Sequence, residues 1–424
     1  MRVRVTGRQP LRGVYHVSGN SNAAMALIAA SMLSAEPVRL TNLPDTVSVG
    51  VMIEIGEALG MHADQDDHAA TLRTEHVIGR GLNREHTDAL GGTLLFMAPI
   101  LARRRHARMT IDYAISRLQP HLAALRDLGF GLSIDGGTID IRAETWDTKE
   151  IVLEQTSVTA TGLVCMLAAA LGGQTTIINA ASEPHIVDLL SLLATMGASV
   201  EGAGSNLVTI TGCGGNETLR GGAYAVSPDH IEAASVAAIA ALSGGRLTIE
   251  GTRRRDMRLI ARVYERLGVN ISLDNDAIVV PVHERFEIPS RDEDVDVTVE
   301  SSPWPGFPSD LIATATVIAT QARGTALIHE KLFNNRMLFV DRLTAMGAQI
   351  VLCDPHRAIV VGPTRLHADY VDNPDVRTGL AMLAAALCAQ GETVIDGAEA
   401  FDRTFEGVLD KLATVGAHIR RGEV

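Results

Sequence analysis

Two hydrophobic patterns alternate along this chain, and the first of them ends a helix at a glycine. In its clearest copy, LTAMGAQIV at 343–351, the apolar end of a helix runs into glycine and an alternating strand follows. Glycine adopts the left-handed backbone conformation after a helix without steric cost, so the pattern predicts a helix end and a turn. It occurs six times, at spacings of 69, 68, 71, 79 and 69 residues, with Gly60, Gly129, Gly197, Gly268, Gly347 and Gly416 at its centres.

The second pattern is an alanine-rich helix followed by an alternating strand. Its six copies include AASMLSAEPVRLTNL early in the chain, LAAALGGQTTIINA near the middle and AAALCAQGETVIDG towards the end. These repeats are too long and too mixed in character for a solenoid of short helix pairs. We therefore predict six α+β units that fill the chain, with their alanine-rich helices packed together and their sheets outside.

Length, charge and composition narrow the class of protein. A chain of 424 residues usually forms two or three domains. With 37 basic and 50 acidic residues the net charge is −13, which disfavours general binding to nucleic acid or to an anionic membrane. Aromatic residues make up only 4%, too few for base-stacking surfaces. The longest apolar runs, such as 379–389, are too short to span a bilayer.

The N-terminal residues and the cysteines indicate a cytoplasmic location. Residues 1–5 alternate as a strand does and do not resemble a signal peptide. The four cysteines are scattered without a C-x-x-C pair, which predicts a reducing compartment and no metal cluster. We expect all four to be buried thiols: Cys165, Cys213, Cys353 and Cys388.

Polar residues stand before several predicted helices. VSGNSN at 17–22 precedes a helix expected over 23–33, Ser157 precedes one expected over 160–171, and Asp229 lies in SPDHIE at 227–232. Such residues can cap the helix or can help an anion bind at its N-terminus. From the pattern alone, capping is the favoured interpretation.

The second repeat is predicted to open with a helix over 87–102 that ends in the basic run RRRHAR at 103–108. A solvated helix end, where cations complement the helix dipole, is favoured over a nucleic-acid patch. The next stretch, 111–121, brings aspartate, tyrosine, serine, arginine and histidine together in a predicted loop before a helix. Loops of this kind often hold ligands.

The fifth repeat contains the least ordinary stretch, SSPWPGFPSD at 301–310. Its prolines and glycine predict a rigid lead into a helix over 311–322, with the Asp310 carboxylate at its start. Arg336, Arg377 and Arg403 are each predicted to lie near the start of a later helix. If these helix starts face one cleft, the arginines form an electropositive pocket that suits a small phosphate or carboxylate compound.

At these residues the chain resembles the enolpyruvyl transferase family, and its UDP-N-acetylglucosamine branch in particular. The resemblance covers nearly the whole chain and is carried by VSGNSNAAM, SVTATGLVCMLAAAL, ASEPHIVD, SPDHIEA, PGFPSD, FNNRM, DVRTG and FDRTFE. It implies a two-domain inside-out α/β barrel of six βαβαββ units. It also implies a discontinuous domain division, with 22–229 as one domain and 1–21 plus 230–424 as the other.

The resemblance implies a reaction that requires no cofactor and no metal. An enolpyruvyl (1-carboxyvinyl) group passes from phosphoenolpyruvate to a hydroxyl of a nucleotide sugar such as UDP-N-acetylglucosamine, through a tetrahedral adduct that expels phosphate. The branch acts in peptidoglycan biosynthesis. Proton transfer to the methylene carbon and from the hydroxyl requires fixed acid and base groups, and cations must hold the phosphate and carboxylate.

The same resemblance assigns roles to individual residues. Asp310 matches the carboxylate beside the acceptor hydroxyl, and Arg403 is grouped with it as catalytic. Arg336 and Arg377 match anion-binding arginines. The other substrate-binding matches are Asn22, Arg117, His121, Ser157, Val158, Thr159, Asp229 and Leu332, of which 157–159 receive the uridine diphosphate through their backbone.

Some positions depart from the family pattern. Ser21 stands where the family has lysine, Gly91 where it has arginine, and Gln155 where it has a lysine beside the uridine. The loop that carries the general acid is shortened and has no cysteine, so Asp112 is the candidate replacement. Three hypotheses follow: a divergent enzyme making enolpyruvyl-UDP-N-acetylglucosamine, a paralogue with another hydroxyl acceptor or altered chemistry, as in secondary metabolism, and a noncatalytic binding relative. The retained Asp310 and arginines argue against the third.

Overall fold

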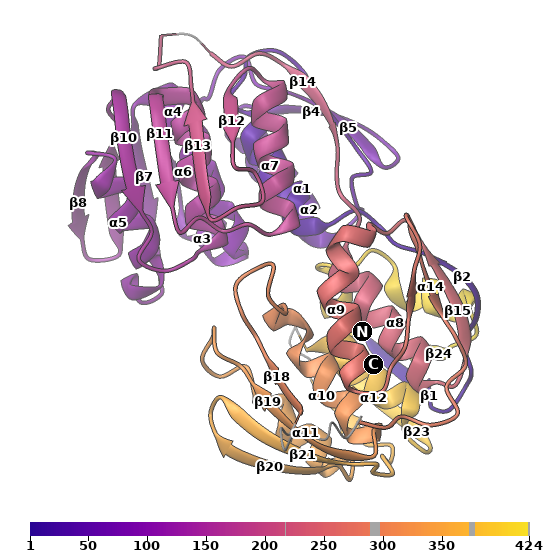
Figure 1. Ribbon diagram of the computed structural model, residues 1–424. Coiled ribbons are helices and arrows are strands. Elements are labelled where there is room, and N and C mark those ends of the chain that lie inside the picture. The colour runs from indigo at the N-terminus through magenta and orange to yellow at the C-terminus, as the bar shows by residue number, and fades with distance from the viewer. Residues whose placement is uncertain (217, 289–296, 373–377, 423–424) are drawn as a thin grey trace. The chain divides into compact units, whose positions relative to one another are not determined.

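The protein consists of two compact units in the computed structural model, which describes residues 1–216, 218–288, 297–372 and 378–422 (Figure 1). Unit 1 contains Met1–Ser18 and Pro228–Val424, and unit 2 contains Gly19–Ser227. Within the described ranges the strands form six four-stranded sheets, three in each unit. The predicted α/β fold of six repeated units is confirmed.

Unit 2 contains three sheets, whose strands follow in spatial order. The first is β14 (Gly222–Ala225), β3 (Val38–Thr41), β5 (Ala69–Arg73) and β4 (His62–Asp66). The second is β6 (Gly81–Leu82), β7 (His106–Thr110), β9 (Thr138–Arg142) and β8 (Gly131–Asp135). The third is β10 (Trp146–Val152), β11 (Gly172–Ile178), β13 (Leu207–Thr211) and β12 (Ser199–Glu201).

The three sheets of unit 1 repeat this arrangement. The first is β2 (Arg12–His16), β15 (Arg246–Glu250), β17 (Ala277–Val280) and β16 (Ser272–Leu273). The second is β18 (Val297–Glu300), β19 (Gly324–His329), β21 (Arg357–Gly362) and β20 (Gln349–Asp354). The third is β22 (Tyr370–Val371), β23 (Glu392–Asp396), β1 (Arg2–Thr6) and β24 (His418–Gly422).

Each sheet combines one parallel pair of strands with antiparallel neighbours. In the second sheet of unit 1, β18 runs parallel to β19, and β21 is antiparallel to both β19 and β20. Parallel neighbours need a long crossover, and α10 (Ile312–Gln321) supplies it between β18 and β19. The chain therefore leaves β18 and β19 at the same edge of the sheet.

Each unit is closed by strands from distant parts of the chain. In unit 2 the last strand, β14, lies parallel to the early strand β3 and pairs Gly222 with Val38. In unit 1 the N-terminal strand β1 lies between β23 and β24, where Val3 pairs with both Ile395 and Arg421. Strand β2 is likewise parallel to β15.

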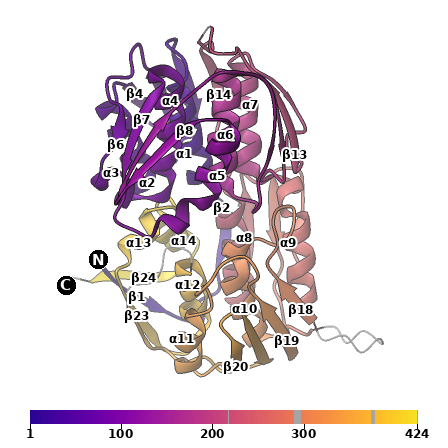
Figure 2. The ribbon, with the colours of Figure 1, turned by 90° about the vertical axis from the view of Figure 1, so that its left-hand side faces the viewer.

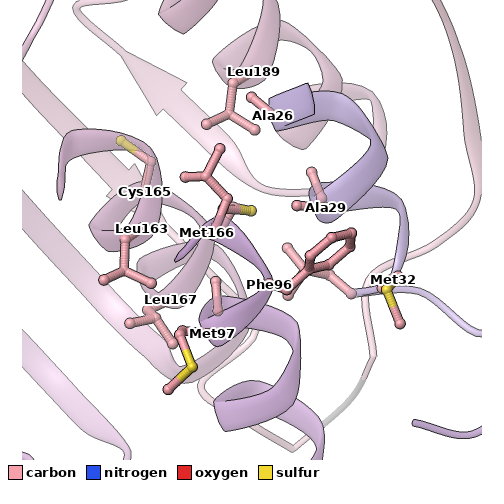
Figure 3. Packing of buried hydrophobic residues seen from close by; sticks show 14 of the residues in the cluster. Ala26, Ala29, Met32, Phe96, Met97, Leu163, Cys165, Met166, Leu167 and Leu189 are labelled. Atoms are coloured by element: carbon pink, nitrogen blue, oxygen red, sulfur yellow. The ribbon is translucent and has the colours of Figure 1, made fainter. Parts of the chain in front are cut away.

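The core of each unit is built from apolar helices, most of which are buried all round. In unit 1, α8 (His230–Leu242), α10 and α12 (Gly379–Cys388) contact one another (Figure 2). In unit 2, α4 (Met97–Arg104) contacts both α1 (Ser21–Ser31) and α6 (Val158–Leu171). Figure 3 shows this second core, in which alanine lets the α1 backbone approach Phe96 and Met166.

The remaining helices place one face on these cores and the other in solvent. On α9 (Arg254–Arg266), for example, Met257, Ile260 and Tyr264 are buried while Arg258 and Arg262 are exposed. No helix among the described residues is long and apolar enough to cross a membrane. These outer helices are α2 (Val47–Ala58), α3 (Arg84–Ala89), α5 (Gln119–Asp127), α7 (Pro184–Thr195), α9 (Arg254–Arg266), α11 (Phe339–Ala345), α13 (Glu399–Asp402) and α14 (Val408–Thr414).

The six repeated glycines turn the chain as predicted. All of them have positive φ angles, between 79° at Gly129 and 112° at Gly197. At Gly347, for example, φ is 100°, and the chain passes from α11 into β20. The sequence pattern therefore identified six real helix ends.

The helix predicted over 87–102 is wrong, because the chain forms three shorter elements there. Helix α3 ends at Ala89, Leu90 is extended with φ −166° and ψ 155°, and a 3₁₀ helix, η1 (Gly91–Phe96), precedes α4. Two adjacent glycines lower the helical propensity of this segment. The helix expected over 23–33 starts and ends two residues earlier, at Ser21 and Ser31.

Two further sequence expectations need correction. Arg103 is not part of a solvated helix end, because its guanidinium donates hydrogen bonds to the carbonyls of Met32, Ser34, Thr74 and Glu75. Burial lowers its pKa from the ordinary arginine value. Of the cysteines, Cys165 and Cys388 are buried, Cys213 is half-buried, and Cys353 is exposed on β20.

Candidate functional site

The candidate site of unit 1 lies where the parallel strands β18 and β19 end. Ser301 follows β18 directly and Glu330 follows β19, and in both cases the next segment is irregular. The proline-rich segment then leads into the 3₁₀ turn η3 (Ser309–Leu311) and α10, which places Ser309 and Asp310 at the start of the crossover. Ligands of open α/β sheets commonly bind outside the carboxyl ends of strands.

Arg336 lies in the segment after β19 and hydrogen-bonds to two residues in the segment after β18. Its Nη1 donates to Asp310 Oδ1 at 2.8 Å and to Ser309 Oγ at 2.7 Å. The guanidinium carbon lies 4.1 Å from the Phe333 ring centroid, close enough for a cation–π contact. Arg336 is only 15% exposed in its side chain, whereas Asp310 is 43% exposed. The arginine is thus fixed while the carboxylate remains accessible.

One donor of this arginine has no hydrogen-bond partner among the described residues. The Nε of Arg336 is buried and has no acceptor within the described part of the chain. An unpaired buried donor is costly, and an anion bound there would satisfy it. The same arginine helps line a cavity of about 210 Å³. The polar lining also includes Ser309, Asp310, Asn335, Arg342 and Asp372, and the apolar lining includes Ile312, Phe339, Val371 and Met382.

The predicted cluster of three arginines is described only in part. Arg377 lies outside the residues that the structure describes. Arg403 follows α13 directly, so it is found at the end of a short helix, not at the start of one. It is exposed and makes no ion pair with any described acid. Convergence of Arg336, Arg377 and Arg403 therefore stays a prediction.

Leu332 and Asp229, two other predicted contacts, also belong to unit 1. Leu332 is 39% exposed, and its amide donates to Glu330 Oε1 at 2.9 Å. Asp229 is buried and caps α8, because its Oδ1 accepts from the amides of Ile231 and Glu232 at 2.8 and 3.1 Å. The capping interpretation of this stretch is confirmed.

In unit 2 the start of α1 is also organised by a cap. Asn20 accepts a hydrogen bond from the Ala23 amide at 2.9 Å, so capping is confirmed here as well. Asn22 is exposed in the first turn of the helix. Ser21 is buried, with its Oγ 3.1 Å from Thr46 Oγ1. Gly91 is exposed, and a Cβ added to it would meet no atom within 4 Å.

The start of α6 brings two predicted contacts together. Ser157 caps this helix at 3.4 Å from the Ala160 amide, and Val158 and Thr159 form its first turn. Thr159 Oγ1 lies 2.8 Å from His121 Nε2. His121 belongs to α5 and not to a loop, and burial lowers its pKa to about 4. The ring is therefore neutral near pH 7.

Asp112 and Arg117 lie in the segment before α5, which contains the 3₁₀ turn η2 (Ile115–Leu118). Asp112 forms an ion pair with Arg84, the first residue of α3. Arg117 is exposed, and its guanidinium carbon lies 5.9 Å from the Tyr113 ring centroid. Sequence reasoning did not single out Arg84, which places a cation beside the candidate acid.

Comparison with known proteins decides the family. The family described as EPSP synthase (3-phosphoshikimate 1-carboxyvinyltransferase) matches residues 5–412. A UDP-N-acetylglucosamine 1-carboxyvinyltransferase of Treponema denticola is 38% identical over 99% of both chains, and that of Treponema pallidum is 38% identical over 98% of both. The chain belongs to the enolpyruvyl (carboxyvinyl) transferases. Its members are enzymes, so the protein is a transferase of this class.

Solved structures of enolpyruvyl transferases share the fold. The enolpyruvyl transferase NikO from Streptomyces tendae has a TM-score of 0.88 at 23% identity, covering 99% of this chain and 98% of its own. EPSP synthase from Acinetobacter baumannii has a TM-score of 0.74 at 15% identity, with full coverage of both chains. At these identities the likeness shows the fold alone.

Sequence reasoning about this enolpyruvyl transferase missed Glu330 and Ser309. Glu330 is completely buried, and it accepts hydrogen bonds from both Ser309 and Ser301. One signal was present in the sequence: Ser301 and Glu330 each follow directly on an alternating stretch, where the chain leaves a strand. Polar residues at such positions on neighbouring parallel strands lie at one edge of the sheet.

Proposed function

We propose that the protein transfers the enolpyruvyl group of phosphoenolpyruvate to a hydroxyl of UDP-N-acetylglucosamine and releases phosphate. The observation that carries the proposal is the Asp310–Arg336 pair beside a cavity of unit 1, on the fold of an enolpyruvyl transferase. Full-length relatives at 38% identity that carry this acceptor in their names support it. In this proposal the enzyme acts in the cytoplasm, in peptidoglycan biosynthesis.

The proposed reaction has two steps that balance. In the first, the acceptor oxygen bonds to C2 of phosphoenolpyruvate, the hydroxyl loses its proton and C3 gains one. In the second, C3 loses a proton and the bond from C2 to the phosphate oxygen breaks, which releases phosphate and restores the double bond. Each step needs a base at one atom and an acid at another.

Asp310 is the proposed base for the acceptor hydroxyl. It is accessible, and its Oδ1 is held by Arg336, so the orientation of the carboxylate is limited before substrate arrives. Arg336 is proposed to hold a phosphate or carboxylate oxygen through its unpaired Nε. Arginine suits this task because its donors form a planar fork that matches such oxygens. Arg403 and Arg377 are proposed as further anion-binding groups.

The first turn of α6 is proposed to receive the diphosphate of the acceptor. Val158 and Thr159 begin this 14-residue helix, where backbone N–H groups without intrahelical partners favour an anion. The neutral His121, bonded to Thr159, adds no charge there. The remaining acceptor contacts are proposed to be Asn22, Arg117, Ser157, Asp229 and Leu332.

Asp112 is proposed as the acid that protonates C3. Its ion pair with Arg84 favours the ionised carboxylate, whereas an acid must carry a proton. The proposal therefore requires that the pair opens when substrate is bound. Replacement of Asp112 by asparagine should lower phosphate release strongly, and unchanged release in that variant would remove Asp112 from the mechanism.

A second acceptor class is favoured by one observation in unit 2. The positions of Ser21 and Gly91 carry no charge, so phosphoenolpyruvate meets fewer cations there than the family pattern supplies. This difference favours a paralogue that uses the same chemistry on another hydroxyl compound. The noncatalytic alternative is disfavoured by the accessible Asp310 and its paired Arg336.

Phosphate release separates these functions. The purified protein is incubated with phosphoenolpyruvate and, in turn, UDP-N-acetylglucosamine, other nucleotide sugars, nucleotides and hydroxy acids, with Asp310→Asn as the inactive control. Release with UDP-N-acetylglucosamine, together with a product heavier by one enolpyruvyl group, supports the first function. Release only with another acceptor supports the second, and release with none contradicts both.

A further inference from the structure

We propose that Glu330 is a positioning residue that keeps Arg336 shared between Ser309 and Asp310. This inference deepens the proposed function, because it concerns how the proposed base is held. Glu330 itself is completely buried and lines no part of the described cavity. It acts through other side chains and does not touch substrate.

Glu330 collects four hydrogen bonds at the end of β19. Its Oε1 accepts from Ser301 Oγ at 2.9 Å and from the Leu332 and Phe333 amides at 2.9 and 3.1 Å. Its Oε2 accepts from Ser309 Oγ at 2.6 Å. A buried carboxylate is stable only when its lone pairs are satisfied in this way. The four donors come from segments after both parallel strands, so Glu330 joins those segments together.

The Ser309 hydroxyl transmits this arrangement to Arg336. A serine hydroxyl has a single proton, and Ser309 donates that proton to Glu330. The lone pairs of the oxygen are then available to Arg336 Nη1, which lies 2.7 Å away. Glu330 therefore fixes the direction of the Ser309 hydrogen bond, and so makes Ser309 an acceptor for the arginine.

This second acceptor limits how Arg336 binds Asp310. Because Nη1 is divided between Ser309 and Asp310, the arginine holds the carboxylate through Oδ1, at 2.8 Å. Without an acceptor at Ser309, the guanidinium is free to turn and form a two-bond fork with the carboxylate, the geometry that such pairs prefer. A fork would occupy both oxygens of the proposed base and withdraw Nε from the anion.

A glutamine at position 330 cannot replace the carboxylate. All four neighbours are donors, whereas an amide offers one oxygen that accepts and one nitrogen that only donates. If the oxygen keeps the Ser301 and backbone bonds, the nitrogen faces Ser309 and reverses the direction of that hydrogen bond. The relay to Arg336 is then disturbed although the side chain keeps its size.

The test compares two serines that donate to the same carboxylate. Ser309→Ala removes the relay, whereas Ser301→Ala removes a bond to Glu330 without touching Arg336. We expect Ser309→Ala and Glu330→Gln to lower kcat roughly 10–100-fold, the range caused by an ångström-scale misplacement of a catalytic group. KM for the acceptor should change less than about threefold, whereas KM for phosphoenolpyruvate should rise because Nε is withdrawn from the anion. The acidic limb of the kcat–pH profile should move to lower pH, because a two-bond fork favours the ionised carboxylate. In Ser301→Ala, kcat should stay within about twofold of wild type.

Two results would overturn the proposal. One is an equal loss of kcat in the two serine variants at matched thermal stability. The other is a crystal structure of Ser309→Ala in which Arg336 still makes a single bond to Asp310. The crystal structure of Ser309→Ala tests this inference even if no acceptor releases phosphate. Failure of the proposed function and failure of this inference are therefore distinguished. If Glu330→Gln does not fold, Ser309→Ala remains informative because it leaves three bonds to Glu330 in place.

Discussion

Units 1 and 2 have the same kind of architecture, yet they hold their candidate functional residues in different ways. In unit 1, Glu330, Ser309, Arg336 and Asp310 form one continuous chain of hydrogen bonds that draws on several segments. In unit 2 the polar residues at helix starts mostly act as caps or make single contacts, as Asn20 caps α1 and Thr159 contacts His121. A repeated helix start needs a cap wherever it occurs. Polar residues there do not mark a site by themselves, whereas a charged network between elements does.

The two units also differ in the charged groups at their candidate functional residues. The network of unit 1 holds an arginine with an unpaired donor beside an accessible carboxylate. In unit 2 the uncharged Ser21 and Gly91 stand at positions where the family pattern has cations, and Arg84 is paired with Asp112. This contrast predicts that changes in unit 1 remove activity, and that added cations in unit 2 increase ligand binding.

The largest effect is expected for Asp310→Asn. The amide keeps the shape of the side chain but cannot accept a proton, so kcat for phosphate release should fall roughly 10²–10⁴-fold. Asp341→Asn is the matched control, because Asp341 is an exposed aspartate in the first turn of α11. If Asp310→Asn retains more than a tenth of the wild-type kcat, the prediction that activity depends on the network of unit 1 is wrong.

Arg336→Lys should have the next largest effect. Lysine cannot form the planar fork that serves Ser309, Asp310 and an anion at once, and it stacks differently on Phe333. We expect the Kd of phosphoenolpyruvate, measured by calorimetry, to rise roughly 10–100-fold. The exposed Arg262 on α9 supplies the control substitution, Arg262→Lys. Equal affinities in the two variants would mean that the Arg336 fork is not used.

Added cations in unit 2 provide the opposite test. In Gly91→Arg the new side chain has open space around its Cβ. In Ser21→Lys a larger side chain replaces a buried serine that lies beside Thr46. Together they should lower the Kd of phosphoenolpyruvate about tenfold, and each alone should do less because both charges act on one ligand. Gly50→Arg on α2 is the control, since a Cβ there also meets nothing within 4 Å.

The same contrast predicts slow turnover of UDP-N-acetylglucosamine by the wild-type protein. With no cation at positions 21 and 91, kcat should lie below the roughly 1–10³ s⁻¹ of typical enzymes, and the double variant should raise it. Steady-state phosphate release measures both. A wild-type kcat inside that range would show that this unit does not need the two charges.

A smaller effect concerns the pH dependence of stability. The folded-state pKa of His121 is about 4, below its ordinary value, because burial disfavours the charged ring. The unfolded chain therefore binds more protons between these two values, and the free energy of unfolding falls as the pH decreases through this range. The loss between pH 7 and pH 5 is on the order of 2 kcal/mol. It should be absent in His121→Gln and present in the control His62→Gln, an exposed histidine on β4.

The last prediction is that fosfomycin does not modify the protein covalently. Fosfomycin alkylates a loop cysteine in the family that this chain resembles, and alkylation needs a thiolate. The segment from Asp112 to His121 contains no cysteine. Burial raises the pKa of both Cys165 and Cys388 to about 12. Intact-protein mass spectrometry should show no adduct after incubation with phosphoenolpyruvate and fosfomycin, and an adduct at any of the four cysteines would contradict this expectation.

Periodicity predicted the fold because it reflects burial over many residues. The alanine-rich helices and the six glycines repeat in step, so one error does not change the architecture. Interruptions within a single helix are harder to predict from periodicity. The pair Gly91–Gly92 interrupts a segment whose apolar pattern predicted one helix. Arg103 also looked like a solvated cation, because the carbonyls that it binds come from segments far away in the sequence.

The candidate site was predictable only where local sequence is unusual. Asp310 follows a proline-rich stretch that predicts a rigid lead into a helix, so the sequence alone indicates this position. Glu330 did not stand out, because its proposed role depends on a hydrogen bond from Ser309, which is 21 residues away in the sequence. The anion-binding roles of Arg377 and Arg403 came from the arginines predicted near helix starts and from the resemblance, and they remain proposals.

The strands that complete the two units can pair with their partners at different times during synthesis on the ribosome. Unit 2 is continuous, so β14 can join β3 soon after Ser227 has emerged. Strand β1 must wait for β23 and β24, its partners at the far end of the chain. Domains generally fold as they are synthesised, and long waiting times leave strand edges exposed. Unit 1 is therefore the part of the nascent chain that most needs protection from premature association, because β1 is synthesised long before the strands that flank it.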